Sequence, residues 1–200
     1  RIGPSQLGCR ENPYGKANTP NPDNRRVCLS EIDPRQRGLF NAAWMLAYVA
    51  ACAGGGVDAL ALGAPSGPFG HFHRPGSVPA PYYDDATGRT VYPGFHLIAG
   101  LARHSGATLL ETRVAPKGKV AALGLETPGE RELWLANLTA RPLVAGLGDA
   151  GAKGGRVVIL DAAGFTGLTT NADYLDGAER DLPGSNIELD AYAVARIRLG

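Results

Sequence analysis

Long apolar and polar blocks alternate through the middle of the chain, and they predict a strand, a helix and a second strand. The short apolar run 27–29 predicts the first strand, and the polar residues 30–33 follow it. A nearly continuous apolar segment then extends to residue 53, where three glycines end it because glycine adopts positive φ easily. The apolar run 57–62 predicts the second strand. Strand, helix and strand in this order are typical of a parallel sheet.

The predicted helix begins at Asp33 and Pro34 and extends to Ala53. Aspartate caps free backbone N–H groups, and proline is tolerated in the first helical turn. The helix is apolar on nearly all sides, so protein must cover most of its surface. Its apolar part is shorter than the roughly 20 residues that cross a bilayer. The helix therefore belongs inside an α/β body.

The pattern changes near residue 106, after a second predicted helix over 93–104. The later apolar runs are short, and 188–199 alternates between apolar and polar residues, which is typical of an antiparallel β-sandwich. We predict two domains, a partial (β/α) barrel in 1–106 and a β-sandwich in 107–200. The predicted strands of the sandwich are 109–114, 120–125, 132–138, 157–160 and 188–199.

The first domain has too few predicted strands and helices to cover its own main helix. We therefore predict the C-terminal portion of a (β/α)8 barrel followed by an antiparallel β-sandwich, with more chain before Arg1. Its open sheet edge needs further strands, which the rest of the barrel or a second copy in a homo-oligomer would supply. Without the other barrel strands, we expect the chain alone to be nearly inactive.

Composition excludes several classes of function. The net charge of +1 over 200 residues gives no reason to expect binding to nucleic acid or an anionic membrane. The three cysteines have no metal-like spacing, and we expect reduced thiols in a cytoplasmic protein. The sequence has neither a Gly-x-Ser-x-Gly elbow nor a phosphate-binding glycine loop. We expect no cofactor and no bound metal.

Glu31, His71 and His73 are the catalytic candidates. Glu31 follows the first predicted strand, where a barrel places nucleophiles and general bases, but it is equally consistent with a solvated loop acid. His71 and His73 follow the second predicted strand, and imidazole transfers protons near neutral pH, but both are also consistent with ordinary loop histidines. Loops after parallel strands emerge at one end of the sheet, so we expect the three side chains to lie within reach of one ligand.

Arg10, Asn12 and Tyr14 are the candidates for substrate binding, because they combine donors and acceptors that suit a polyol or a carboxylate. The alternative is that this Asn-Pro-Tyr-Gly turn is a rigid loop that binds no ligand.

Three segments, IGPSQLGCRENPYG, DPRQRGLFNAAWMLAYVAACAGGGVDALALGAPSGPFG and ELDAYAVARIRL, resemble the C-terminal half of D-apionate lactonase-like proteins. The resemblance implies a barrel related to glycoside hydrolases, an appended β-sandwich and a lactonase activity in branched-sugar catabolism. In the related glycoside hydrolases a glutamate that ends the seventh strand is the nucleophile. Glu31 fits that position if 27–29 is the seventh strand.

The leading hypothesis is a hydrolase that acts on a sugar-acid lactone, with a carboxylate or histidine as the base and with Arg10, Asn12 or Tyr14 stabilising the oxyanion. One alternative is a retaining glycoside hydrolase with Glu31 as its nucleophile. Another is a non-catalytic carbohydrate-binding or assembly module. In each case the expected partner is a small sugar acid or a carbohydrate.

Overall fold

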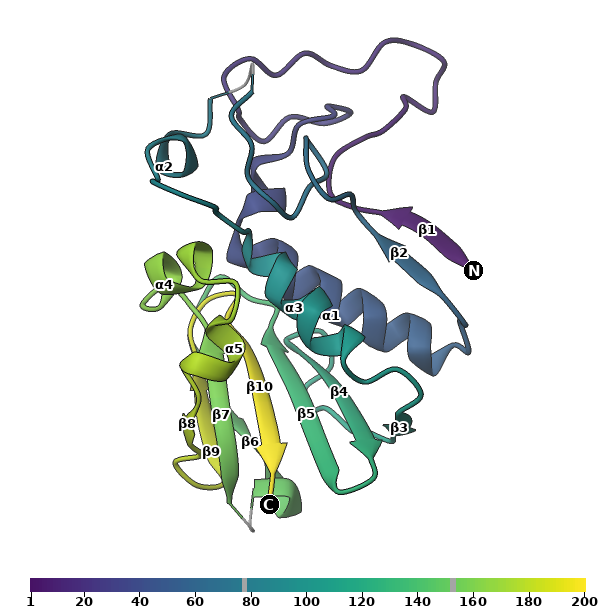
Figure 1. Ribbon diagram of the computed structural model, residues 1–200. Helices are drawn as coiled ribbons and strands as arrows, with labels where there is room; N and C mark the ends of the chain where they lie inside the picture. The colour runs from purple at the N-terminus through teal and green to yellow at the C-terminus, as the bar shows by residue number, and fades with distance from the viewer. Residues whose placement is uncertain (77–78, 152–153) are drawn as a thin grey trace.

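The computed structural model describes residues 1–76, 79–151 and 154–200. Two helices separate a small parallel sheet from a larger antiparallel sheet (Figure 1). The first part of the chain forms β1 (Ile2–Ser5), η1 (Pro34–Arg37), α1 (Leu39–Gly54), β2 (Leu60–Leu62), α2 (Pro81–Asp84) and α3 (Pro93–Ala102). The second part forms β3 (Thr108–Leu110), β4 (Val120–Thr127), β5 (Glu130–Asn137), β6 (Leu143–Gly146), η2 (Gly148–Gly151), β7 (Gly155–Leu160), α4 (Phe165–Thr170), α5 (Tyr174–Gly177), β8 (Arg180–Asp181), β9 (Asn186–Leu189) and β10 (Val194–Leu199).

The parallel unit is present, but its first strand is not the one that the sequence predicted. β1 pairs in parallel with β2, with Ile2 opposite Leu60, and α1 connects the two strands. Residues 27–29 form no strand: they end in a turn in which Leu29 has a φ of 56°. A left-handed residue cannot continue a strand, and an apolar run this short is compatible with a turn. The prediction of a strand at 27–29 was therefore wrong.

The long central helix forms where the sequence predicted it. The Asp33 carboxylate accepts a hydrogen bond from the backbone N–H of Arg35 at 2.9 Å and caps the 3₁₀ turn η1, and α1 follows after Gly38. Its side chains Ala42 and Leu46 are completely buried in a core shared with α3 and the large sheet. In the described part of the chain, no helix combines the length and the apolar character needed to cross a membrane.

The C-terminal part is a sandwich of two antiparallel sheets. The larger sheet has the strand order β3-β4-β5-β10-β7-β8, and the smaller sheet pairs β6 with β9. The central strand β10 is buried on both faces: Ala195 and Ile197 pack between the two sheets, while Val194 belongs to the core beneath the helices. The helices thus cover one face of the large sheet, as Figure 1 shows.

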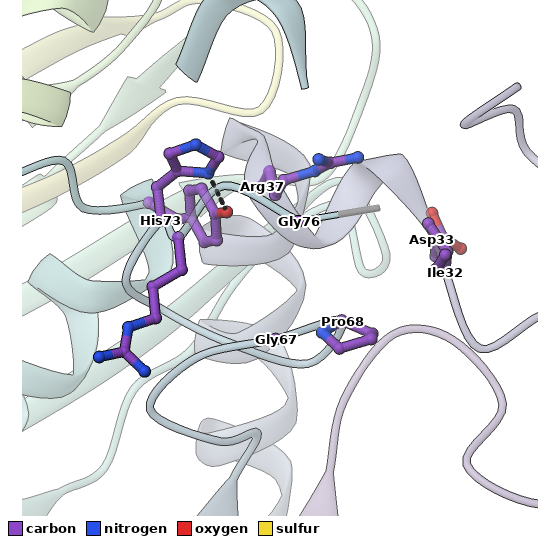
Figure 2. A pocket seen from close by; sticks show the side chains of 9 residues that line it. Ile32, Asp33, Arg37, Gly67, Pro68, His73 and Gly76 are labelled. Carbon is purple, nitrogen blue, oxygen red and sulfur yellow. Dashed lines mark hydrogen bonds between the residues drawn. The ribbon is translucent and has the colours of Figure 1, made fainter. Parts of the chain in front are cut away.

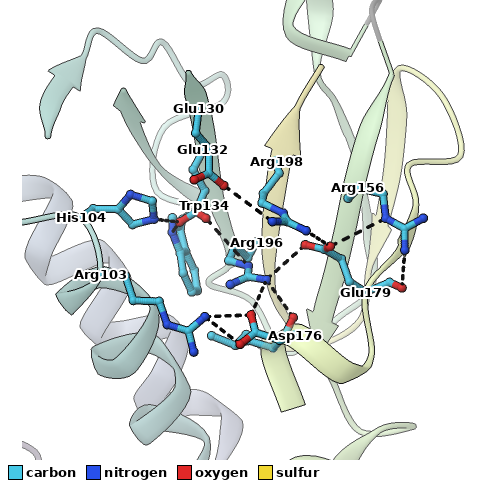
Figure 3. A network of polar contacts seen from close by, with 11 residues as sticks. Arg103, His104, Glu130, Glu132, Trp134, Arg156, Asp176, Glu179, Arg196 and Arg198 are labelled. Atoms are coloured by element: carbon cyan, nitrogen blue, oxygen red, sulfur yellow. Dashed lines mark hydrogen bonds and ion pairs between the residues drawn. The ribbon is translucent and has the colours of Figure 1, made fainter. Parts of the chain in front are cut away.

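A network of charged side chains joins the helices to the large sheet (Figure 3). His104, just after α3, lies with Nε2 2.8 Å from Glu132 Oε1 on β5. Arg196 on β10 contacts the same carboxylate at 3.9 Å and Asp176 of α5 at 3.5 Å, and Asp176 also pairs with Arg103 at 2.8 Å. Because Glu132 and Arg196 are buried, their charges depend on these partners for compensation.

Candidate functional site

The loops that follow the two parallel strands meet at the carboxyl end of the sheet, and a buried glutamine ties them together. The Gln36 side chain accepts a hydrogen bond from the backbone N–H of Leu7 at 3.2 Å. It also donates to the carbonyl oxygens of Phe69 and Gly70 at 3.2 and 3.3 Å. One loop comes after β1 and the other after β2, so Gln36 fixes their relative position. Active sites of (β/α) barrels lie at this end of the strands.

A cavity of about 150 Å³ opens beside these loops (Figure 2). Its polar lining consists of Asp33, Arg37, His73, Arg74 and Tyr92, which come from segments far apart in the sequence. Complete small-molecule sites usually occupy about 300–1,000 Å³, so the cavity accounts for only part of such a site. A larger cavity of about 490 Å³ lies in the sandwich, where most of the lining side chains are apolar.

His73 is the cavity residue with the clearest chemical environment. Its Nδ1 lies 3.0 Å from the hydroxyl oxygen of Tyr92, and its Nε2 lies 2.9 Å from Oδ1 of Asp84. Only 7% of the His73 side chain is exposed. Burial raises the pKa of Tyr92 to about 12, against the opposing effect of Arg37. Tyr92 therefore carries its proton at neutral pH, and its hydroxyl lies within hydrogen-bond distance of His73.

Asp33 and Arg37 give the cavity both signs of charge. Burial opposes ionisation of Asp33, but hydrogen bonds and charge from Arg35 outweigh it and lower the pKa of Asp33. The Arg35 guanidinium contacts this carboxylate at 2.5 Å. The guanidinium of Arg37 donates to the side chain of Asn24, and the backbone oxygen of Arg37 accepts from the hydroxyl of Tyr83. Asp33 is already paired, so Arg37 and Arg74 are the cationic groups that remain to face an electron-rich ligand.

His71 occupies a different environment from His73. It is buried, and its Nε2 lies 2.8 Å from the carbonyl oxygen of Leu62 at the end of β2. Because a carbonyl only accepts, Nε2 carries the proton. Burial lowers the pKa of His71. Within the described chain, its Nδ1 and both amide atoms of buried Asn41 have no hydrogen-bond partner. His71 does not line the cavity, and its contact with Leu62 links the loop to the end of β2.

Glu31 is exposed and does not line the cavity, although Ile32 and Asp33 beside it do. The loop after β1 does bring Glu31 to the expected end of the sheet, but not directly behind a strand. The residue that ends the first parallel strand is Ser5, whose hydroxyl lies 2.8 Å from that of Tyr48. The argument that placed Glu31 in the position of a glycosidase nucleophile therefore fails, because it depended on a strand at 27–29.

The three candidates for substrate binding lie outside the cavity lining. The side chain of Asn12 accepts from the backbone of Tyr14 at 3.0 Å and donates to the carbonyl of Ala17 at 3.2 Å, so it holds its own turn. Tyr14 is 77% exposed, and the Arg10 guanidinium lies 5.0 Å from the centre of the Phe69 ring. These contacts favour the alternative of a rigid turn.

Asp84, Tyr92 and Arg37 are site residues that sequence reasoning missed. Asp84 and Tyr92 lie in a stretch without periodicity, and a long-range backbone bridge between Phe72 and Val91 brings them to His73. The sequence has no local signal for such a bridge. Among the residues that the structure describes, no group of at least three His, Cys, Asp or Glu side chains is arranged to hold a metal ion.

The parallel strands, the polar cavity at their carboxyl ends and the appended sandwich define a (β/α)-barrel protein with a C-terminal β-domain. Residues 1–106 match the family model of the D-apionate lactonase TIM barrel domain, and residues 117–197 match that of the D-apionate lactonase C-terminal immunoglobulin-like domain. The chain belongs to the D-apionate lactonase family, a family of lactone hydrolases. The predicted fold class and the resemblance seen in the sequence are both confirmed.

Individual proteins agree with this assignment. The D-apionate lactonase of Brucella anthropi is 34% identical over 143 residues, which are 71% of this chain and 22% of that protein. The chain thus spans about a fifth of the length of this curated relative. A glycoside hydrolase family 30 endoxylanase from Clostridium papyrosolvens superposes with a TM-score of 0.54 over 82% of this chain and 39% of its own, at 10% identity. A family 30 xylanase from Clostridium acetobutylicum gives 0.53 over 81% and 39%, also at 10% identity. At this identity the two xylanases show the fold alone.

Proposed function

We propose that this chain contributes part of the active site of an enzyme that hydrolyses a sugar-acid lactone, of the kind named by its relative D-apionate lactonase. The observation that carries the proposal is the cavity at the carboxyl ends of β1 and β2, where His73 lies beside Arg37 and Arg74. A member of a lactone hydrolase family needs a base and an oxyanion-stabilising group at this end of its barrel.

The residues of the cavity suit the steps of lactone hydrolysis. Water attacks the ring carbonyl, and the imidazole of His73 is the group in the cavity suited to take up its proton. The carbonyl oxygen becomes negative in the tetrahedral intermediate, and Arg37 or Arg74 stabilises that charge. The product carries a carboxylate, which a guanidinium also binds well.

The chain spans about a fifth of its curated relative, so we propose that strands outside it complete the site. Within the described residues, β1 and β2 pair only with each other, which leaves the outer edge of each without a partner strand. An unpaired parallel edge of this kind takes up further strands, either from the rest of a barrel or from a second copy.

The test uses the full-length protein and a panel of substrates that contains sugar-acid lactones, including that of D-apionate, and nitrophenyl glycosides. We expect acid release from the lactones, and a fall in kcat/KM of at least roughly tenfold, or about 1.4 kcal/mol, for His73→Ala and Arg37→Ala. Arg113→Ala is the matched control, because Arg113 is an exposed arginine of the sandwich domain. Cleavage of glycosides but not of lactones, with loss in Glu31→Gln, would favour the glycosidase. Absence of both activities would favour a binding module.

A further inference from the structure

We propose that Tyr92, His73 and Asp84 form a proton relay, in which the Tyr92 hydroxyl contacts the attacking water and Asp84 is a positioning residue that fixes the orientation of His73. The inference rests on the proposed lactone hydrolysis and specifies how its base works. In this relay Tyr92 is the residue that contacts the reactants, and Asp84, which does not line the cavity, acts only by positioning His73.

The imidazole of His73 lies between the other two side chains. Tyr92 Oη lies 3.0 Å from Nδ1 of His73, and Asp84 Oδ1 lies 2.9 Å from Nε2 on the opposite side of the imidazole. The contact with Asp84 is short, although its angle is not that of a linear hydrogen bond. The other oxygen of Asp84 accepts from the backbone N–H of Ala80 at 2.5 Å, which holds the carboxylate in place.

The backbone positions both aromatic residues independently of these side-chain contacts. The backbone N–H of His73 donates to the carbonyl of Thr90 at 3.0 Å, and that of Tyr92 donates to the carbonyl of His71 at 2.9 Å. The Tyr92 ring also packs edge-on against Tyr83, with centroids 4.8 Å apart. The pair of His73 and Tyr92 is therefore built on an antiparallel bridge.

The chemistry of the partners determines where the protons lie. An ionised carboxylate only accepts, so Nε2 of His73 carries the proton and Nδ1 keeps its lone pair. This lone pair accepts the hydroxyl proton of Tyr92. The remaining lone pairs of the Tyr92 oxygen are then available to a water molecule in the cavity that Tyr92 lines. Each ring nitrogen of His73 already has a protein oxygen within 3.0 Å.

In the proposed step, attack of water on the lactone is coupled to two proton transfers. The water oxygen forms a bond to the lactone carbonyl carbon while the π electrons move onto the carbonyl oxygen. The water proton passes to the Tyr92 oxygen, and the Tyr92 proton passes to Nδ1 of His73, which becomes an imidazolium beside Asp84. When the ring C–O bond breaks, the proton returns through Tyr92 to the leaving alkoxide. The products are an alcohol and a carboxylic acid, which then ionises.

The charged groups around the relay are consistent with a concerted transfer. Asp84 lies beside the imidazolium that forms, and Arg37 lies near enough to Tyr92 to favour negative charge on its oxygen. Burial nevertheless raises the pKa of Tyr92 to about 12, so the phenol does not ionise in the resting state. Proton transfer from Tyr92 therefore accompanies attack by water and does not precede it.

Two variants of the full-length enzyme test the relay. Tyr92→Phe keeps the buried ring and removes only the hydroxyl, and Asp84→Asn removes the charge from a side chain that is 32% exposed. We expect each to lower kcat roughly 10- to 100-fold on the lactone with little change in KM. Asp85→Asn is the matched control, because it removes the same charge one residue away on an exposed side chain.

Two further readouts separate a relay from a structural role. Wild-type kcat in H₂O–D₂O mixtures should show a curved dependence on deuterium fraction, because two protons move, and Tyr92→Phe should show a linear one. Asp84→Asn should shift the acidic limb of the kcat profile to lower pH, because the imidazolium loses its carboxylate. Activity of both variants within twofold of wild type, with His73→Ala inactive, would overturn the relay and leave the proposed function standing. A wild type without lactonase activity would overturn both. If Asp84→Asn lowers the melting temperature, the isotope result for Tyr92→Phe decides.

Discussion

Gly100 allows α3 to approach Trp134 on β5, and an added methyl group at this position should loosen the contact between the barrel part and the sandwich. A Cβ atom at residue 100 would lie 2.5 and 2.6 Å from two ring carbons of Trp134 and 3.1 Å from Leu175 Cδ1. Carbon atoms pack best at about 3.5–4.0 Å, so the ring has to move by about 1 Å. Trp134 is completely buried, and its indole N–H donates to Glu132 at 2.5 Å, which resists that shift.

Two opposing effects determine how much Gly100→Ala changes the free energy of unfolding. Alanine is favoured over glycine inside a helix by about 1 kcal/mol. Overpacking of a dense core costs typically 1–3 kcal/mol and occasionally more. Because the ring is fixed on several sides, we expect Gly100→Ala to destabilise the protein by about 1–2 kcal/mol and to lower its Tm.

The assay is thermal unfolding of the full-length protein, followed by calorimetry. The matched control is Gly54→Ala at the end of α1, where an added Cβ meets no atom within 4 Å. This control should leave Tm unchanged or slightly raised. Equal stability of Gly100→Ala and wild type, or an equal loss in both variants, would show that the close approach of α3 does not limit the packing.

Two further predictions concern the charged network and the incomplete barrel. Burial raises the pKa of Glu132 and outweighs the opposing effect of His104. The folded protein therefore loses stability as the pH rises from the ordinary pKa of a glutamate through the raised pKa of Glu132. The Tm of Glu132→Gln, compared with wild type by calorimetry between pH 4 and 8, should therefore become relatively higher with increasing pH; a difference independent of pH would contradict this. The isolated 200-residue chain should turn over lactone at least roughly 100-fold more slowly than the full-length protein, because barrel loops outside it complete the site. Comparable rates would refute that.

The sequence was informative where the signal is periodic. The apolar segment after Asp33 and Pro34 predicted α1, and the stripe after Pro93 predicted α3. The short apolar runs predicted β3, β4, β5 and β7 of the sandwich, but β6 and β8 were missed. The predicted single strand 188–199 is in fact two strands, β9 and β10, which lie in different sheets. These elements are stabilised by burial of a regular face, so the pattern of side chains carries the information.

The sequence was misleading where contacts between distant backbone segments decide the structure. β1 has one apolar residue with a large side chain, Ile2, which is 43% exposed, so its sequence indicates at most the end of a strand and its pairing with β2 defines its place in the fold. The run at 27–29 has the pattern of a strand but has no strand to pair with. The cavity depends on the bridge between Phe72 and Val91, and no local signal predicts it.

The arrangement of α3 explains why the sandwich bears on the geometry of the site. Tyr92 immediately precedes α3, and its backbone carbonyl accepts the N–H of Phe95 in the first turn. Farther along the same helix, Gly100 lies against Trp134 of the sandwich. A helix of this length transmits its position rigidly from one end to the other, because every backbone group inside it is hydrogen-bonded. The packing of α3 on the large sheet therefore sets where the Tyr92 hydroxyl lies relative to His73. In the proposed relay a shift of about 1 Å in Tyr92 would cost roughly 100-fold in rate, so the packing of the sandwich bears on a cavity that none of its own residues line.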